Sequence, residues 1–275
     1  MNAKVSQKIA KSIIWTVAVG IIGILIAIIL FILFRGLPHI NWEFLTQLPR
    51  RMGREGGIAA PIFGTLSITV LAVLISLPFG VGTAFYLAEY TKGGIVTRII
   101  RFAAESLAGI PSIVYGLFGF IFFVVTLGMG WSILSGALTL SIMILPTIIR
   151  TSEEAILAVP KTFREVSFSL GATKWQTIRL AVVPSAVRGI TNGIILAVGR
   201  CVAETAALML TAGSVLSMPD SIMSSTRTMA IHFYLLAVEG LSIEKAFGTA
   251  ALLIILIFFI NVVANMLVDK FVSKG

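Results

Sequence analysis

Arg200 and Glu204 are two residues of opposite charge inside an apolar run, and they are the first candidates for chemistry. The run, from about residue 189 to residue 212, is long enough to span a bilayer. Four residues make about one helical turn, so both side chains are expected on one helix face. Counted from residue 189 at about 1.5 Å per residue, Arg200 lies roughly 16 Å deep, near the membrane midplane. A guanidinium there costs on the order of 2.5–3.5 kcal/mol, so we expect it to face the bundle interior.

This pair has two interpretations. In one, the charges neutralise each other and only allow the span to insert. In the other, which we favour, Arg200 and Glu204 form a gate or a transient anion contact in a translocation path. A guanidinium offers a planar fork of donors that suits phosphate oxygens, and crossing a bilayer does not itself require either charge.

A second candidate is the polar segment at residues 153–184, which we call the knuckle. Thr162 precedes Glu165 by three residues, and Thr173 precedes Gln176 by three. Each spacing is that of a capping box, in which two side chains satisfy N–H groups of the first helical turn. The knuckle is therefore predicted to contain two short helices in tandem.

The ends and faces of these two helices follow from the same residues. Gly171 lies between them, where a helix end favours a left-handed residue without a Cβ. Pro184 is expected to end the second helix, because it lacks an N–H and clashes with the preceding turn. Both apolar faces are expected to be exposed and to need a partner; they consist of Phe163, Val166 and Leu170, and of Trp175, Ile178 and Val182.

The composition indicates an integral membrane protein. Hydrophobic residues make up 57% of the 275 residues and charged residues only 12%, far from the balance of soluble domains. The single cysteine, Cys201, excludes an internal disulfide or a zinc site built on cysteines. The sequence holds no HExxH, GxxxxGK(S/T) or GxSxG motif, so no catalytic centre or cofactor is expected on this chain.

Six apolar runs predict six membrane-spanning helices, and hence an all-α membrane protein. The first run is longer than the apolar region of a signal peptide and is expected to be retained. An irregular connection is predicted at residues 35–57, and a short amphipathic helix on the membrane surface at residues 95–102. The predicted spans are residues 12–34, 58–86, 108–127, 131–149, 189–212 and 246–268.

Basic residues set the predicted orientation. The N-terminal tail, residues 1–11, contains Lys4, Lys8 and Lys11 and is placed in the cytoplasm under the positive-inside rule. Six spans then place the knuckle and the C-terminal tail, residues 269–275, in the cytoplasm too. This bias accounts for the net charge of +9 without nucleic acid. A local exception on the outside, interpreted as a solvated loop rather than an anion or partner contact, is formed by Arg50, Arg51 and Arg54.

The spacing in the knuckle resembles the coupling loop of bacterial ABC importer permeases, which reads Glu-Ala-Ala, three residues, Gly, nine residues and Ile-x-Leu-Pro. Glu165, Gly171 and Pro184 match that pattern in identity. The resemblance implies a coupling helix that docks into a cleft of a separate ATP-hydrolysing subunit; an ordinary amphipathic connector is the alternative. The residues expected to couple to that ATPase are Glu165, Gly171, Phe163, Val166, Leu170 and Trp175.

Residues 56 to about 211 resemble the A-type inner-membrane permease of the phosphate-specific ABC importer. Family members commonly read Arg-x-x-Gly-Glu-Thr in the fifth span, where this chain has Ala203 in place of the glycine. The charged pair is kept, but the close backbone approach that glycine allows is in question. The stretches that carry the resemblance are Gly64–Leu66, Tyr86–Tyr90, Pro111–Phe118, Ile149–Ala155 and Gly199–Ala206.

The resemblance implies the six-span fold of a type I ABC importer permease, with a five-helix core at residues 58–268 that includes the knuckle. It implies a subunit of the inner (plasma) membrane, without ATPase activity of its own, that forms a phosphate path with a second, homologous permease. Two ATPase copies bind and hydrolyse the ATP, and an extracytoplasmic binding protein delivers the phosphate. Closure of the ATPases moves the knuckle as a lever.

Two alternatives stay open. The first keeps the class and changes the cargo to another oxyanion, such as phosphonate or sulfate. The second is a secondary transporter driven by an ion gradient, with Arg200 and Glu204 as a charge relay. A secondary transporter has no need of the knuckle, so the ATP-driven permease is favoured.

Overall fold

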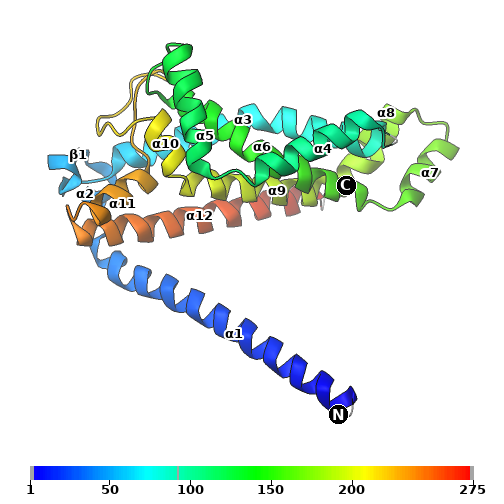
Figure 1. Cartoon of the computed structure of the whole chain (residues 1–275), viewed down its shortest axis with the longest axis horizontal. Coiled ribbons are helices and arrows are strands. Elements are labelled where there is room, and N and C mark those ends of the chain that lie inside the picture. The colour runs from blue at the N-terminus through cyan, green and yellow to red at the C-terminus, as the bar shows by residue number, and fades with distance from the viewer. Residues whose placement is uncertain (1–2, 92, 273–275) are drawn as a thin grey trace.

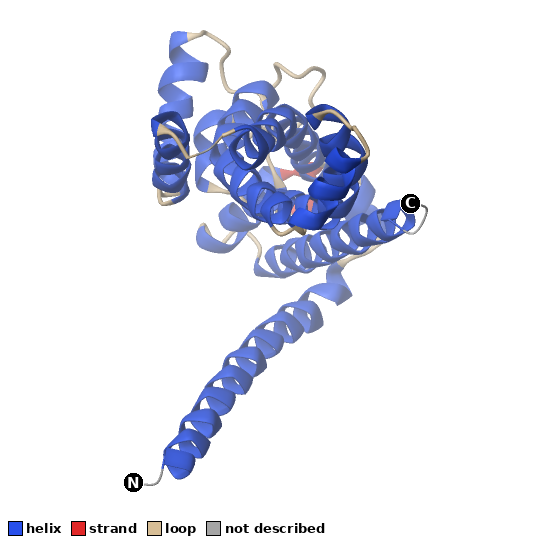
Figure 2. Cartoon of the chain, turned by 90° about the vertical axis from the view of Figure 1, so that its right-hand side faces the viewer, coloured by secondary structure: helices blue, strands red, loops and turns tan. Residues whose placement is uncertain are grey.

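Long helices packed side by side form the body of the protein (Figure 1). The computed structural model describes residues 3–91 and 93–272. Figure 2 looks along the body and shows its helices end-on. The β-structure of the described residues is one two-stranded sheet. The helices of the body are α3 (Ala59–Phe85), α6 (Ile133–Leu157), α9 (Val183–Ala203) and α12 (Ile243–Val272).

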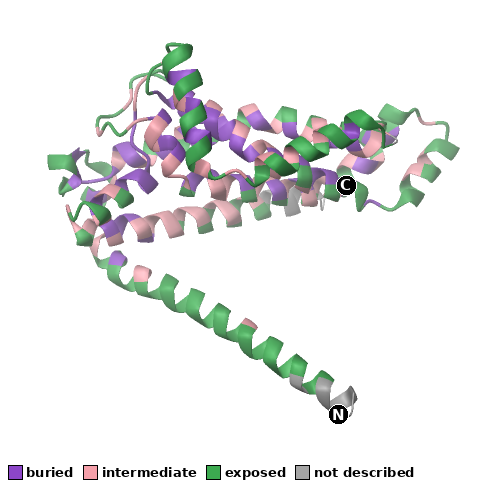
Figure 3. Ribbon diagram, in the orientation of Figure 1, coloured by how far each residue is buried: buried purple, intermediate pink, exposed green. Residues whose placement is uncertain are grey.

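α6 lies at the centre of this body, because small residues let its neighbours come close. A Cβ on Gly193 of α9 would overlap the side chain of Thr151 in α6. A Cβ on Gly80 of α3 would lie 2.6 Å from Ile148 Cγ2 of α6. Close helix contacts through small residues are typical of membrane proteins, and most of α6 is buried as a result (Figure 3).

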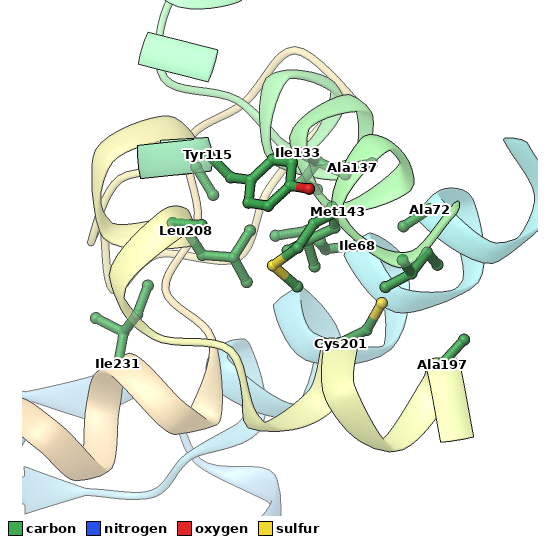
Figure 4. Close-up of a cluster of buried hydrophobic side chains, with 14 of the residues drawn as sticks. Ile68, Ala72, Tyr115, Ile133, Ala137, Met143, Ala197, Cys201, Leu208 and Ile231 are labelled. Atoms are coloured by element: carbon green, nitrogen blue, oxygen red, sulfur yellow. The ribbon is translucent and has the colours of Figure 1, made fainter. Parts of the chain in front are cut away.

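A buried apolar cluster fills the space between α3, α6, α9 and the short helix α10 (Ala206–Thr211). Cys201, near the end of α9, and Leu208, in α10, both point into this cluster (Figure 4). α9 and α10 are separated by a short interruption of the helix at residues 204–205. The cluster therefore packs the two helices together across this interruption.

α1 (Ala3–Gly36) leaves the body at an angle and is exposed along most of its length (Figure 3). It meets the body at its C-terminal end, where the ring centroids of Phe31 and Phe247 of α12 are 5.8 Å apart. Gly36 lies directly against the Phe247 backbone. From about Ile13 onward its exposed side chains are mostly apolar, as expected for a helix that faces lipid. The predicted span at residues 12–34 lies within this helix.

Among the described residues, five helical segments are long and apolar enough to cross a membrane, and a sixth is counted if a bent pair of helices forms one span. The predicted third span is shorter than the others: α5 (Ser112–Gly119) and the π-helical η4 (Phe120–Thr126) follow α4 (Ile95–Ala108) after a bend of 102°. α4 is the predicted amphipathic helix, extended beyond residue 102. The five segments are Ala10–His39, Ala59–Tyr90, Ile133–Leu157, Lys174–Ala203 and Ile243–Met266.

The fifth span differs from its prediction at both ends. α8 (Lys174–Thr177), the π-helical η5 (Ile178–Val182) and α9 form one continuous segment. The prediction that Pro184 ends the second knuckle helix is therefore wrong. Pro184 lies in the first turn of α9, directly after the π turn, where its missing N–H is tolerated. The helix also ends at Ala203 rather than near residue 212.

The end of the body opposite the knuckle is closed by what we call the hairpin cap, residues 37–58 and 213–242 (Figure 1). The connection predicted to be irregular is an ordered set of short elements, and the second segment contains α11 (Met229–Val238). β1 and β2 pair antiparallel, with Pro49 opposite Gly56. The elements of the first segment are η1 (Leu37–His39), α2 (Trp42–Thr46), β1 (Pro49–Arg50), η2 (Arg51–Gly53) and β2 (Glu55–Gly56).

The free ends of α1 and α12 both lie toward the knuckle end of the molecule in Figure 1. This arrangement fits the prediction that both termini and the knuckle share one side of the membrane. That this side is the cytoplasm stays a prediction from the charge bias.

Candidate functional site

One of the two predicted capping boxes forms in the knuckle. The Gln176 N–H donates to Thr173 Oγ1 at 3.4 Å, and the Thr173 N–H donates to Gln176 Oε1 at 2.8 Å. Gly171 has a φ of +81°, which confirms the predicted left-handed position. The box of Thr162 and Glu165 is wrong. α7 (Lys161–Ser169) begins after Pro160, so Thr162 is already inside the helix and cannot cap it.

The apolar face of α7 is exposed as predicted, and it lines a groove. Phe163, Val166 and Leu170 are 50%, 60% and 82% exposed, and all three border a groove of about 540 Å³. Trp175 of α8 is 64% exposed. An exposed apolar groove on an otherwise polar segment is typical of an interaction site.

Two residues of the second predicted apolar face, Ile178 and Val182, were expected to be exposed but are buried. Val182 belongs to a second apolar cluster, which also contains Ala84 of α3 and Ile156 of α6. Glu165 is exposed on α7, and its backbone carbonyl accepts from Ser169 Oγ at 2.9 Å. The structure thus brings together Phe163, Val166 and Leu170, with Glu165 and Trp175 on the surrounding surface.

Arg200 and Glu204 do not share one helix face. Glu204 follows the last residue of α9 and has an extended backbone, with φ −73° and ψ 130°. Its Oε1 accepts the Ala207 N–H at 3.1 Å and so begins α10. Within the described part of the chain, no ion pair joins Arg200 to Glu204. Both are partly exposed, and the depth counted from residue 189 does not hold, because Arg200 lies in the last turn of a helix that starts earlier.

The helix is interrupted directly after Ala203, three residues beyond Arg200. A helix that ends inside a membrane leaves backbone carbonyls without helical partners, and these are tolerated only beside protein or a water-filled cavity. Ala203 supplies no glycine flexibility at this point, yet the backbone still leaves the helix. A cation and a carboxylate therefore flank irregular backbone, an arrangement found where helical transporters bind ions.

A second polar group, missed in the sequence, is buried in the hairpin cap. His232 of α11 is fully buried and Arg227 is 4% exposed. Arg227 Nε donates to the Ser214 carbonyl at 3.0 Å, whereas among the described residues Arg227 Nη1, both ring nitrogens of His232 and Thr226 Oγ1 have no hydrogen-bond partner. Burial, with Arg227 and Lys245 nearby, lowers the pKa of His232 to about 3, so its ring is neutral.

A third feature, the mostly buried pair of Glu89 and Arg164, was also missed. Arg164 Nη2 lies 2.6 Å from Glu89 Oε1. The two residues are 75 positions apart, and only the fold brings them together.

Comparison with known proteins identifies the family. Residues 76–274 match the family described as binding-protein-dependent transport system inner membrane component. This chain belongs to that family. Over 97% of its length it is 34% identical to a probable ABC transporter permease protein, YqgI of Bacillus subtilis, covering 96% of that protein. It is 36% identical to the phosphate transport system permease protein PstA 1 of Mycobacterium tuberculosis, over 77% of this chain and 70% of that protein.

Solved structures support the same fold. The MetNI methionine ABC transporter, in an inward-facing conformation, contains a chain with a TM-score of 0.64 at 19% identity, covering 78% of this chain and 95% of that one. A bacterial transporter that imports the acidic polysaccharide alginate gives a TM-score of 0.65 at 15% identity, covering 97% and 96%. The protein therefore has the type I ABC importer permease fold and is a multi-pass membrane permease subunit.

Proposed function

We propose that this chain is a permease subunit of an ATP-driven phosphate importer. The ATP-driven part rests on one observation, the exposed apolar groove of the knuckle, which no described part of the chain covers. The cargo rests on the relatives that carry phosphate transport in their names and match most of this chain. Phosphonate or sulfate is the alternative cargo.

The knuckle accounts for the partners. The apolar face of α7 docks into a cleft of an ATPase subunit. That subunit, not this chain, binds and hydrolyses the ATP. A second, homologous permease completes the path, and two ATPase copies serve the pair. A phosphate-binding protein docks at the hairpin cap, on the extracytoplasmic side. The alternative function, an ion-driven secondary transporter, does not account for the exposed groove of the knuckle.

Arg200 and Glu204 form a gate or a transient anion contact in the path. The support is their position beside irregular backbone, with the Arg200 guanidinium engaged in none of the four ion pairs found among the described residues. A guanidinium without a carboxylate partner is available to phosphate oxygens.

The test is uptake of labelled phosphate by cells with and without this chain, competed by arsenate and by sulfate. Uptake should require the chain, be suppressed by arsenate and be insensitive to sulfate. Inactivation of the partner ATPase should abolish it. Uptake that survives ATPase inactivation would favour the secondary transporter, and suppression by sulfate would favour the other cargo.

A further inference from the structure

Arg164 of the knuckle ties three separate parts of the chain together. Its Nε and Nη2 donate to Glu89 Oε1 at 2.8 and 2.6 Å. Its Nη1 donates to the Val159 carbonyl at 2.8 Å, and Nη2 also donates to the Ile156 carbonyl at 2.9 Å. Only 18% of the Arg164 side chain and 9% of the Glu89 side chain are exposed. One guanidinium thus joins α7 to the end of α6 and to the segment that follows α3.

Lys174, in the second knuckle helix, reaches the same segment. Its Nζ donates to the backbone carbonyl of Glu89 and lies 4.8 Å from the centre of the Tyr90 ring, a cation–π distance. The hydroxyl oxygens of Ser167 and Thr177 are 2.8 Å apart and link the two knuckle helices. Both short helices therefore contact Glu89, and the second also contacts Tyr90.

Glu89 and Tyr90 lie at the end of the helical segment that begins with α3. Residues Tyr86–Tyr90 form the π turn η3, which continues α3 without a break. Near its other end, α3 packs against the hairpin cap, where a Cβ on Gly64 would lie 2.5 Å from Thr226 Oγ1. π turns occur frequently at functional sites. α3 and η3 thus form one continuous helix that connects the knuckle to the opposite end of the molecule.

We propose that Glu89 and Arg164 are positioning residues that transmit movement of the knuckle to α3. The inference rests on the proposed function, in which an ATPase moves the knuckle. The knuckle is joined to α9 by the chain, through α8 and η5. The contact of Arg164 with Glu89 adds a second connection, so that α3 and α9 move together when the ATPase closes.

The chemistry of this contact explains why both residues are needed. Removing one partner of a buried pair leaves the other charge buried without compensation. Lysine at position 164 cannot replace the arginine, because donors in a planar fork are needed to reach one carboxylate and two carbonyls at once. The pair of Arg150 and Glu154 is a contrast: its atoms are 3.3 Å apart, its side chains are 65% and 68% exposed, and such surface pairs contribute little.

The test uses the full complex of this chain with its second permease, ATPase and phosphate-binding protein, reconstituted in vesicles. It measures phosphate carried per ATP hydrolysed. Glu89→Gln should bind the ATPase and hydrolyse ATP as the parent does, while phosphate per ATP falls at least about ten-fold. Glu154→Gln is the matched control and should keep the parent's ratio within about two-fold. In Arg164→Lys, the phosphate carried per ATP hydrolysed should fall as it does in Glu89→Gln.

Each other result is informative. An unchanged ratio in Glu89→Gln would overturn the inference, and loss of ATPase binding would make Glu89 part of the docking surface instead. If neither Glu89→Gln nor Arg164→Lys accumulates in the membrane while Glu154→Gln does, the pair is a folding element and the inference is also wrong. A parent complex that carries no phosphate on hydrolysing ATP contradicts the proposed function itself, whatever the variants do.

Discussion

The knuckle and the hairpin cap, at opposite ends of the long helices, treat their buried polar side chains in opposite ways. In the knuckle, Arg164 is mostly buried and is paired with Glu89, while apolar side chains of the α7 face, such as Leu170, are exposed. In the hairpin cap, His232 is fully buried with its ring nitrogens unpaired among the described residues, although apolar side chains such as Trp42 are exposed here too. The knuckle thus pairs its mostly buried charge with a carboxylate, whereas the buried ring of His232 stays neutral.

This contrast predicts two kinds of variant. In the hairpin cap, a substitution should act on stability, because the segment is packed against α3; the Met229 N–H donates to Thr65 Oγ1 at 2.8 Å there. In the knuckle, a substitution should act on transport and leave the protein in the membrane. Four changes test this division, ordered by their expected effect on stability.

The largest effect is expected from filling the contact between α3 and the hairpin cap. In Gly64→Val, the Cβ would lie 2.5 Å from Thr226 Oγ1 and 2.8 Å from the Arg227 carbonyl oxygen. Moving that backbone costs about 3 kcal/mol, so membrane abundance on immunoblots should fall sharply. Gly82→Val, in the same helix, meets nothing within 4 Å and should accumulate normally. Normal abundance of Gly64→Val would show that the cap is loosely packed.

The next effect depends on pH and comes from His232. The unfolded chain binds a proton at this histidine below about pH 6.5, whereas the folded protein, with a pKa of about 3, does not. Stability is therefore lost as pH falls from about 6.5 toward 3, by roughly 2 kcal/mol at pH 5.

Thermal unfolding in detergent at pH 7 and pH 5 measures this loss. His232→Gln removes the titrating group and should show a smaller drop between the two pH values than the parent. His39→Gln, which changes the other histidine, is the control and should behave like the parent. Equal drops in all three proteins would mean that His232 is accessible to protons in the folded state.

The third change acts in the knuckle. Gly171→Val forces a branched side chain into a left-handed position, at a local cost of about 1–2 kcal/mol. A Cβ there meets no other atom within 4 Å, so the body should stay intact while co-purification with the ATPase and phosphate uptake decline. Gly171→Asn is the control, since asparagine tolerates this conformation, and it should retain both. Full uptake by Gly171→Val would remove the coupling role.

The smallest effect on stability is expected at the break after α9. Because Arg200 and Glu204 are partly exposed and form no ion pair with each other in the described part of the chain, Arg200→Met should accumulate like the parent but abolish uptake. Arg200→Lys should retain little uptake, since lysine lacks the guanidinium fork. The double variant Arg200→Met with Glu204→Gln is decisive: uptake at the parent's level would reduce the pair to an aid to insertion.

Local patterns in the sequence predicted what depends on neighbours in the chain. The turn at Gly171 and the cap at Thr173 follow from residues a few positions apart, and the structure confirms them. The apolar runs also located the spans, but the third is shorter than predicted and the fifth differs at both ends. The spacing of the knuckle also led to the family. Pro184 was misjudged because a preceding π turn, which the sequence does not reveal, removes the clash that proline normally causes.

The features that the sequence did not predict depend on residues far apart. No pattern connects Glu89 with Arg164, since each looks like an ordinary charge at the edge of an apolar run. Nothing in the sequence indicates that Thr226 and Arg227 are buried, because their burial depends on packing against Gly64 of α3. The break at Ala203 carries no glycine or proline to signal it, so the span was extended to residue 212.

The position of α1 has a consequence for biosynthesis. α1 is translated before α12, yet α1 docks on the body through contacts such as that of Phe31 with Phe247 of α12. Until α12 is made, these contacts cannot hold α1, and its own affinity for lipid has to keep it inserted. It is the most apolar of the five candidate spans. A nascent chain arrested before residue 243 should therefore carry α1 already anchored in the bilayer but not yet docked.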